Sequence, residues 1–242
     1  MASSNVLTWN DFELNACQAV AFTPDEEISP VKIIQNFLPN WAERFDAEPV
    51  VLPASDLLTK ETPRIILQNK RTHWRCHMAS GRTDIFWQKN DSLDPGPTLA
   101  SFLSETAEFL VDYRQFLQAR VGRLAALVSR RCAHESPGLF LSRYFCKQEI
   151  IRGPLNRPES FEIHARKSYV LGGKFKINSW VRNKTGVLPP PSNRHIVLVE
   201  QDLNTLSEDA QTLSFENADI RDFFSTVASE FDSILAIYYP AI

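Results

Sequence analysis

The sequence is poor in glycine and lacks the glycine-rich motifs that bind phosphates or present a nucleophile. Only 8 of its 242 residues are glycine, and none forms G-x-G-x-x-G, a P-loop or G-x-S-x-G. These absences exclude the nucleotide-binding and hydrolase classes that those motifs define. No cofactor is therefore expected.

The four cysteines form no C-x-x-C pair, and long apolar runs are missing. Cys17, Cys76, Cys132 and Cys146 are widely spaced, which is typical of reduced thiols in a cytosolic protein rather than of a disulfide framework. No apolar run approaches the ~18 residues that a membrane-spanning helix needs. The first residues, MASSNVLTWNDFEL, show no basic region followed by an apolar stretch, so we expect no signal peptide. We expect a cytoplasmic protein without a membrane partner.

Hydrophobic residues make up 43% of the chain and aromatic residues 11%, which is enough to build a packed core. Charged residues make up 23%, the usual share of a globular protein. The charges are distributed unevenly, because the ends of the chain are acidic and its middle is basic. The net charge is −7 for residues 1–63, +5 for 64–89, −4 for 90–119, +11 for 120–194 and −8 for 195–242.

Periodic apolar residues predict a succession of strands and helices. Ser29-Pro30 and Ser136-Pro137 are typical of helix starts, with serine as the cap and proline in the first turn. Gly172-Gly173 suits a hairpin turn with positive φ. We expect helices at 30–45, 99–117, 137–145 and 220–238, the last with Asp219 as its cap; strands within 6–22 and at 64–69, 73–78, 83–88, 121–131, 161–170, 174–182 and 195–201; and a loop over 184–193.

The two halves of the chain show the same order of elements: a strand, a helix begun by Ser-Pro, strands in a hairpin, and a long phenylalanine-rich helix. The expected fold class is therefore α+β, with duplicated β-α-β(n)-α units over 1–119 and 120–242 in one compact unit. Antiparallel sheets backed by long helices are the arrangement of TATA-binding-protein-like and helix-grip-like folds. Two helix-backed sheets and one continuous sheet are both compatible with this order, and so is a single α+β domain with an accidental repetition.

Three segments carry a resemblance to a known family. They are the hairpin turn Ser80-Gly81-Arg82, the helix Phe102–Phe116 running into the strand Arg123–Arg131, and a closing helix with Phe223, Phe224, Phe231 and Ile234. Over residues 60–240 the chain resembles a sporadically distributed, uncharacterised bacterial protein family of similar length. Members of that family end the arginine-bearing strand in a pattern similar to Asn-Arg, whereas this chain has Arg130-Arg131. The resemblance implies a bacterial protein and brings no catalytic residue with it.

Two motifs suggest chemistry at first sight. Ser29-x-x-Lys32 and Lys184-Thr185-Gly186 match elements of serine penicillin-binding enzymes, but no Ser-Asp-Asn lies between them, and such short matches arise by chance. His73-x-x-x-His77 would present both histidines to a metal on a helix. The segment alternates like a strand, however, and two histidines beside Arg75 suit an anion better than a cation. We expect no metal site.

The remaining feature is a basic sheet face made by two predicted hairpins. Alternation places cationic side chains on one face of each hairpin, with Trp180 available for stacking. The alternative is a solvated face that the acidic helices neutralise, within the chain or across a homodimer. The candidate anion- or partner-binding residues are Arg71, His73, Arg75, His77, His164, Arg166, Lys174, Lys176, Trp180 and Arg182.

This pattern favours a non-enzymatic binding or interaction protein. The basic face is expected to dock an acidic protein partner, encoded by a neighbouring gene, or a nucleic acid. The alternative is an enzyme of unrecognised type whose site contains His73, His77 or His164.

Overall fold

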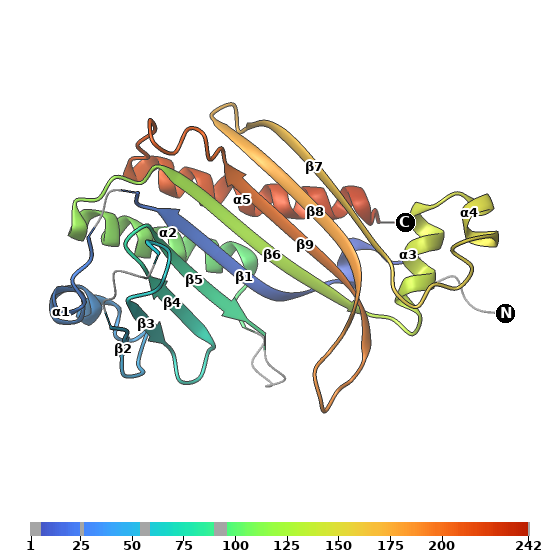
Figure 1. Cartoon of the computed structure of the whole chain (residues 1–242), viewed down its shortest axis with the longest axis horizontal. Helices are drawn as coiled ribbons and strands as arrows, with labels where there is room; N and C mark the ends of the chain where they lie inside the picture. Colours follow the sequence, from blue (N-terminus) through green and yellow to red (C-terminus); the bar gives the residue numbers. More distant parts are fainter. Residues whose placement is uncertain (1–5, 25–26, 54–58, 90–95, 242) are drawn as a thin grey trace.

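A computed structural model describes residues 6–24, 27–53, 59–89 and 96–241 (Figure 1). Within them, nine strands form one sheet in the order β2-β3-β4-β5-β1-β6-β9-β8-β7. Every neighbouring pair is antiparallel. The strands are β1 (Glu13–Phe22), β2 (Val50–Val51), β3 (Ile65–Gln68), β4 (Trp74–Met78), β5 (Arg82–Gln88), β6 (Arg123–Ala133), β7 (Glu162–Leu171), β8 (Phe175–Val187) and β9 (His195–Thr205).

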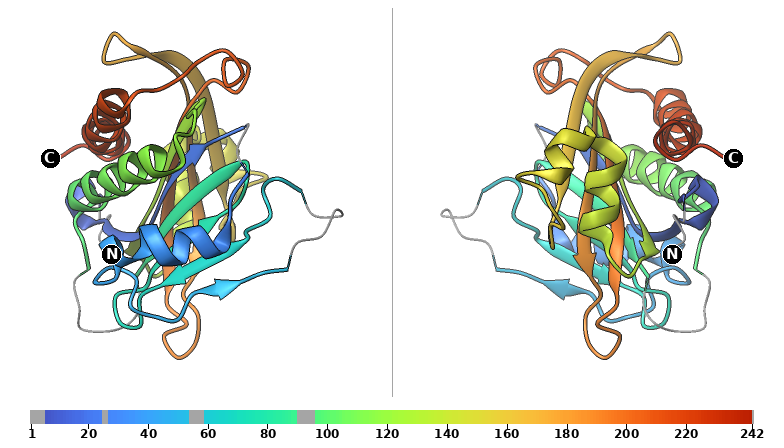
Figure 2. Two further views of the ribbon diagram at one scale, coloured as in Figure 1. Left: turned by 90° about the vertical axis from the view of Figure 1, so that its left-hand side faces the viewer. Right: turned by 90° about the vertical axis from the view of Figure 1, so that its right-hand side faces the viewer.

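Two long helices, α2 (Leu99–Leu117) and α5 (Asn217–Tyr238), lie side by side on one face of the sheet (Figures 1 and 2). Arg221 of α5 ties them together by donating to both carboxylate oxygens of Glu108, each at 2.7 Å. Shorter helices, α3 (Pro137–Phe145) and α4 (Gln148–Arg152), lie between β6 and β7 along the chain. No helix in the described residues is long and apolar enough to cross a membrane. We call the sheet face turned away from α2 and α5 the open face.

The core lies between the sheet and the two helices. In β4, for example, Trp74, Cys76 and Met78 are buried towards the helices while Arg75 is exposed on the open face. The apolar side of α5 is fully buried, and Phe223, Phe224 and Phe231 have no exposed surface. Side chains of adjacent residues in a strand point to opposite faces, so each strand gives one set of residues to the core and another to the open face.

One charged residue, Arg130 of β6, points into this core. Its guanidinium donates to Gln201 Oε1 at 2.6 Å and reaches the carboxylate of Asp232 on α5. Gln201 in turn donates to the backbone oxygen of Phe231 at 2.9 Å. Burial lowers the pKa of Arg130, and nearby Asp232 opposes that shift. The polar cluster therefore fixes α5 at one position along the sheet.

The strand order shows the duplication that the sequence predicts. Outward from the centre, the first half runs β1, β5, β4, β3 and the second runs β6, β9, β8, β7, and the first half adds the two-residue β2 at its outer edge. Each half therefore places its first strand at the centre and its last strand next to it, and each ends in a long helix. The central strands β1 and β6 pair with each other, so the halves share one continuous sheet.

Several details differ from the predictions, including the presence of β2 and α4, which were not predicted. The segment after Ser29-Pro30 is irregular: α1 (Pro30–Lys32) gives way to a π-helix, η2 (Ile33–Phe37), and a 3₁₀ turn, η3 (Leu38–Trp41), because Pro39 has no N–H for a regular helix. Residue 184 starts no loop, since β8 pairs with β9 as far as Val187. The cap of α5 is Glu216, whose backbone N–H donates to Asp219 at 2.8 Å, so Asp219 completes a capping box instead.

Candidate functional site

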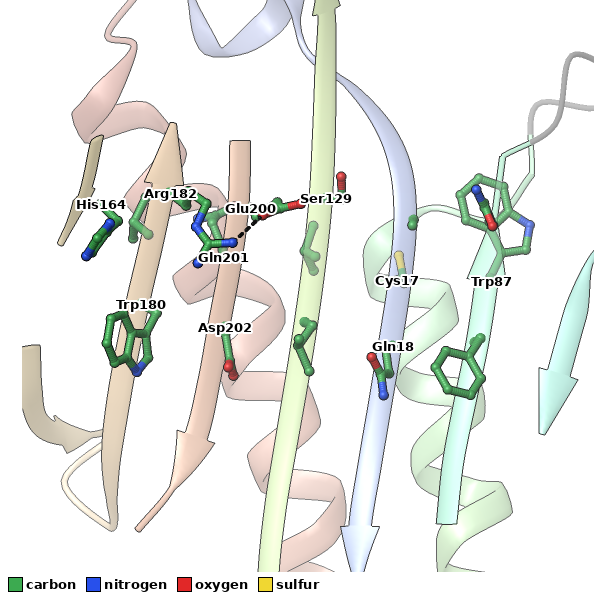
Figure 3. A pocket seen from close by; sticks show the side chains of 16 residues that line it. Cys17, Gln18, Trp87, Ser129, His164, Trp180, Arg182, Glu200, Gln201 and Asp202 are labelled. Carbon is green, nitrogen blue, oxygen red and sulfur yellow. Dashed lines mark hydrogen bonds and ion pairs between the residues drawn. The ribbon is translucent and has the colours of Figure 1, made fainter. Parts of the chain in front are cut away.

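The open face is hollowed at the centre of the sheet, where a cavity of about 530 Å³ spans six strands from β5 to β7 (Figure 3). Its shape follows from side-chain size. Small residues, Ala16 and Ser129, face each other across β1 and β6, whereas Phe86 and Trp180 lie towards the two sides. The row of residues that crosses the cavity from β7 to β4 is Arg166, Trp180, Asp202, Leu127, Gln18, Phe86 and Arg75.

One side of the cavity carries an aromatic platform on a basic background. Trp180, on the strand next to the sheet edge, is 37% exposed. The Arg166 guanidinium lies 5.2 Å from its ring centroid, and the His164 ring 6.1 Å from it. Asn178 positions Arg166 by accepting a hydrogen bond of 3.2 Å from it. This arrangement offers a flat apolar surface beside a fixed positive charge.

The opposite side carries a second aromatic pair, Phe86 and His77, with ring centroids 4.9 Å apart. Burial lowers the pKa of His77, against the opposing effect of Asp84, so this histidine is neutral near pH 7. His73, Arg75 and His77 line an adjoining depression of about 370 Å³ with Phe86. Phe86 is four strands from Trp180, which at about 4.8 Å per strand separates the two platforms by about 19 Å.

The floor between the platforms is polar and partly buried. Gln18 donates to Asp84 at 2.7 Å, and Arg82 donates to the other oxygen of that carboxylate at 2.7 Å. Asp202 accepts a hydrogen bond from Asn204 at 2.9 Å, but no basic group in the described residues forms an ion pair with it. Burial raises the pKa of Asp202, and Asn204 and Arg123 offset this only in part. Asp202 is thus a hydrogen-bond acceptor beside Trp180, and its burial in the ionised form lowers the stability of the fold.

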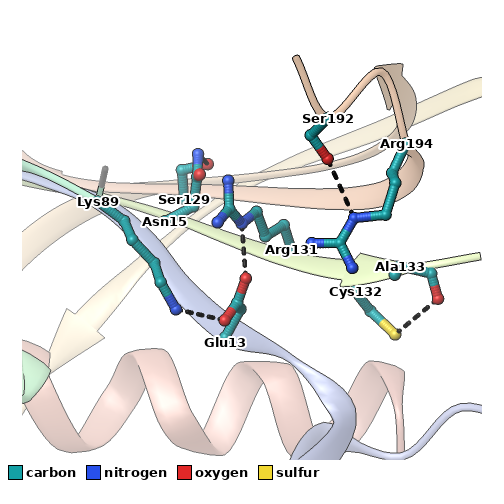
Figure 4. Close-up of polar contacts among 9 residues, drawn as sticks. All are labelled: Glu13, Asn15, Lys89, Ser129, Arg131, Cys132, Ala133, Ser192 and Arg194. Atoms are coloured by element: carbon teal, nitrogen blue, oxygen red, sulfur yellow. Dashed lines mark hydrogen bonds and ion pairs between the residues drawn. The ribbon is translucent and has the colours of Figure 1, made fainter. Parts of the chain in front are cut away.

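Several basic residues of the open face are already neutralised by acids on the same face. Arg182 contacts Glu162 at 3.0 Å and Glu200 at 3.3 Å, and Lys184 contacts Glu200 at 2.8 Å. Further along the face, Glu13 of β1 accepts from Arg131 of β6 at 2.7 Å and also contacts Lys89 (Figure 4). Burial alone would raise the pKa of Glu13, but these two cations outweigh it and hold the value low.

Basic side chains without an acidic partner remain on the same face. Among the described residues, Arg75, Arg166 and Lys176 form no ion pair. Arg75 and Arg166 lie at the two ends of the row that crosses the cavity, and Lys176 lies on β8 four residues from Trp180. The net effect is a mixed surface with a few available cations, less basic than the sequence suggests.

The structure places most of the candidate residues on or beside the open face. Two lie elsewhere. Lys174 is in the β7–β8 turn and contacts Asp219 and Asp222 of α5 at 2.7 and 2.9 Å, so it belongs to the helix side. Arg71 is in the turn before β4, where Asn69 accepts from its backbone N–H. His73 precedes β4 in a left-handed conformation (φ 58°) yet still lines the second depression. The candidates on the open face are Arg75, His77, His164, Arg166, Lys176, Trp180 and Arg182.

The motifs that suggested catalysis do not converge. His73 and His77 lie at β4 and His164 on β7, with five strands between them. Ser29 caps α1, which Figure 1 shows near β2 and β3, whereas Lys184 lies on β8 in the second half. Within the described residues no three histidines, cysteines, aspartates or glutamates are grouped to hold a metal ion.

Sequence reasoning missed Gln18, Phe86 and Asp202, which line the cavity, and Asp84, which accepts a hydrogen bond from Gln18. Each lies at an alternating position of a strand, so period-2 alternation in β1, β5 and β9 was the pattern that could have found them. What the alternation could not supply was the pairing of β1 with β6, which brings the residues of the two halves together.

The fold defines an α+β protein with a duplicated unit and one helix-covered sheet. No protein-family model matches the chain, and no curated protein matches it. Among solved structures it is similar to the Methanococcus jannaschii TBP at 10% sequence identity, covering 90% of this chain and 98% of that one, with a TM-score of 0.26.

Proposed function

We propose that the protein is a non-enzymatic binding protein whose open face binds single-stranded nucleic acid. The observation that carries this proposal is Trp180, which is exposed beside Arg166 at the edge of a 530 Å³ cavity. Bases stack on exposed aromatic rings, and arginine adds a contact to the phosphate or to the base itself. Phe86 offers a second ring about 19 Å away across the sheet, a distance that several nucleotides of one strand can span.

The charge distribution supports weak, salt-sensitive binding. Several cations of the open face are paired, and the proposed phosphate contacts are Arg75, Arg166 and Lys176, which form no ion pair with any described residue. Three contacts to a single strand give a salt slope of about −2, so affinity should fall about 20-fold between 50 and 200 mM salt. A fully basic face would give a much steeper slope.

The test is a fluorescence titration with single-stranded and duplex oligonucleotides at those two salt concentrations. Trp180→Ala should weaken single-strand binding about 5- to 150-fold, since stacking contributes about 1–3 kcal/mol per base. Trp9→Ala is the matched control, because Trp9 is 42% exposed but lies outside the cavity. The double variant Arg75→Glu plus Lys176→Glu should abolish binding. Equal binding by wild type and both open-face variants would refute the proposal.

A further inference from the structure

Strand β7 ends the sheet with a long uncovered edge. It pairs with β8 along ten consecutive residues without a bulge and has no strand on its other side in the described chain. Eight of its ten residues are exposed, including Ile163 and Val170 at 38% and 54%. The opposite edge strand, β2, is only two residues long. Proteins commonly shorten, bulge, charge or interrupt their edge strands with proline to prevent pairing. β7 is long, unbulged and free of proline, and its only such feature is charge, at Glu162, Arg166 and Lys167.

The hydrogen-bond register shows which backbone groups of β7 are unused. Thr185 N–H donates to Phe161 C=O at 3.1 Å, which makes these two residues a hydrogen-bonded pair at the start of the ladder. Hydrogen-bonded and non-hydrogen-bonded pairs alternate along an antiparallel ladder. Odd-numbered residues therefore bond to β8, and even-numbered residues direct their N–H and C=O groups to the free edge. The outward-facing residues are Glu162, His164, Arg166, Ser168 and Val170.

We infer that this edge receives an extended, acidic segment of a protein partner, which adds a tenth strand to the sheet. Backbone hydrogen bonds to the even-numbered residues would supply affinity, and side chains would supply specificity. His164 and Arg166 flank the edge on the open face, and Lys167 flanks it on the helix side, against the single acid Glu162. In a partner strand of alternating acidic and apolar residues, the acids lie beside His164 and Arg166 on the open face and the apolar residues lie beside Ile163 on the helix side.

The same charges argue against a second copy of the chain as the occupant. Two β7 strands that pair antiparallel about their centre bring Arg166 and Lys167 close to the same residues of the other copy. Like charges opposite each other destabilise a strand pair. The edge is thus selective for a strand of opposite charge.

The test uses a fluorescein-labelled ten-residue peptide of alternating glutamate and valine, with a lysine–valine peptide as its counterpart. Ser168→Pro removes an outward N–H without breaking a bond to β8, and Ser168→Ala is the matched control because it removes only the hydroxyl that donates to Asn178. We expect the acidic peptide alone to bind, about tenfold more weakly to Ser168→Pro, and with unchanged affinity to Ser168→Ala.

Equal binding of the two peptides, absence of binding to wild type, or equal affinity of both Ser168 variants would overturn the inference. A wild-type dimer that Ser168→Pro converts to monomer would instead assign the edge to a second copy. Circular dichroism and melting of each variant check that the fold is intact. The outcome is separable from that of nucleic-acid binding, because Arg75→Glu plus Lys176→Glu leaves β7 unaltered and Ser168→Pro leaves the Trp180 platform in place.

Discussion

Replacing Phe231 with alanine removes an aromatic ring from the middle of α5, at a position without any exposed surface. The ring lies between α5 and the sheet, among the other buried side chains of that helix. The backbone of this residue is also held, because Phe231 C=O accepts a hydrogen bond from Gln201 at 2.9 Å. With the helix anchored there, the surroundings have little freedom to collapse into the vacated space.

The expected loss of stability follows from that constraint. Phenylalanine-to-alanine substitutions in packed cores cost about 3–5 kcal/mol, as the sum of the lost transfer free energy and the cavity left behind. A single domain is stable by about 5–15 kcal/mol, so this variant loses a large share of its stability. For a chain of this size, each kcal/mol corresponds to about 2–4 °C in Tm, which gives a decrease of about 6–20 °C.

Thermal and urea denaturation followed by circular dichroism measure the effect. Ile237→Ala is the matched control, because Ile237 lies on the same helix but is 77% exposed. Its change should stay within about 0.5 kcal/mol. If Phe231→Ala melts at the wild-type temperature, or if both variants lose the same stability, α5 does not pack on the sheet as described.

Three further results are expected. Asp202→Asn should raise Tm at neutral pH, because burial raises the pKa of this carboxyl group and its ionised form therefore lowers the stability of the fold. The difference in Tm from wild type should shrink as the pH falls through that raised pKa towards the ordinary pKa of aspartate. Melting of both proteins over a series of pH values measures this. Cys146 should react first with a thiol reagent at pH 8, since burial raises the pKa of Cys17 to about 12 and that of Cys132 to about 11; Cys146→Ser should remove the fast phase. Treatment with a chelator should leave Tm unchanged, because no metal is needed for folding. If the purified wild-type protein contained stoichiometric zinc and His73→Ala did not, this prediction would be wrong.

Much of the fold could be predicted from the sequence because its elements have strong local patterns. The apolar stripe of α2 and the alternation in β4 specify both their type and their buried side. The irregular segment after Ser29-Pro30 was not predictable in this way. Its apolar residues have the spacing of a helix, but Pro39 interrupts the backbone hydrogen bonding that a regular helix needs. The loop expected from residue 184 failed for the opposite reason: tertiary pairing with β9 extends β8 beyond the point where its own composition favours a strand.

The candidate site was only partly predictable, because charge counts along the chain ignore which charges meet. Residues 120–194 carry +11, yet Lys174 is paired with carboxylates of α5 and Arg182 with Glu162 and Glu200. Arg130 is buried altogether. Those pairings join segments that are far apart in the chain, so they depend on the strand order. The exposed Trp180, by contrast, was predictable from period-2 alternation within its own hairpin.

The central pairing of β1 with β6 also has a consequence for synthesis of the chain. β1 ends at Phe22 and β6 at Ala133, so about 110 residues must be added before the partner strand is complete, which takes roughly 5–20 s at ribosomal rates. During that interval one edge of β1 has no neighbour, although β5 can already cover the other. The nascent first half therefore presents an open strand with the largely apolar run Ala19–Phe22 outside the ribosome. Its protection from aggregation depends on how quickly the second half arrives.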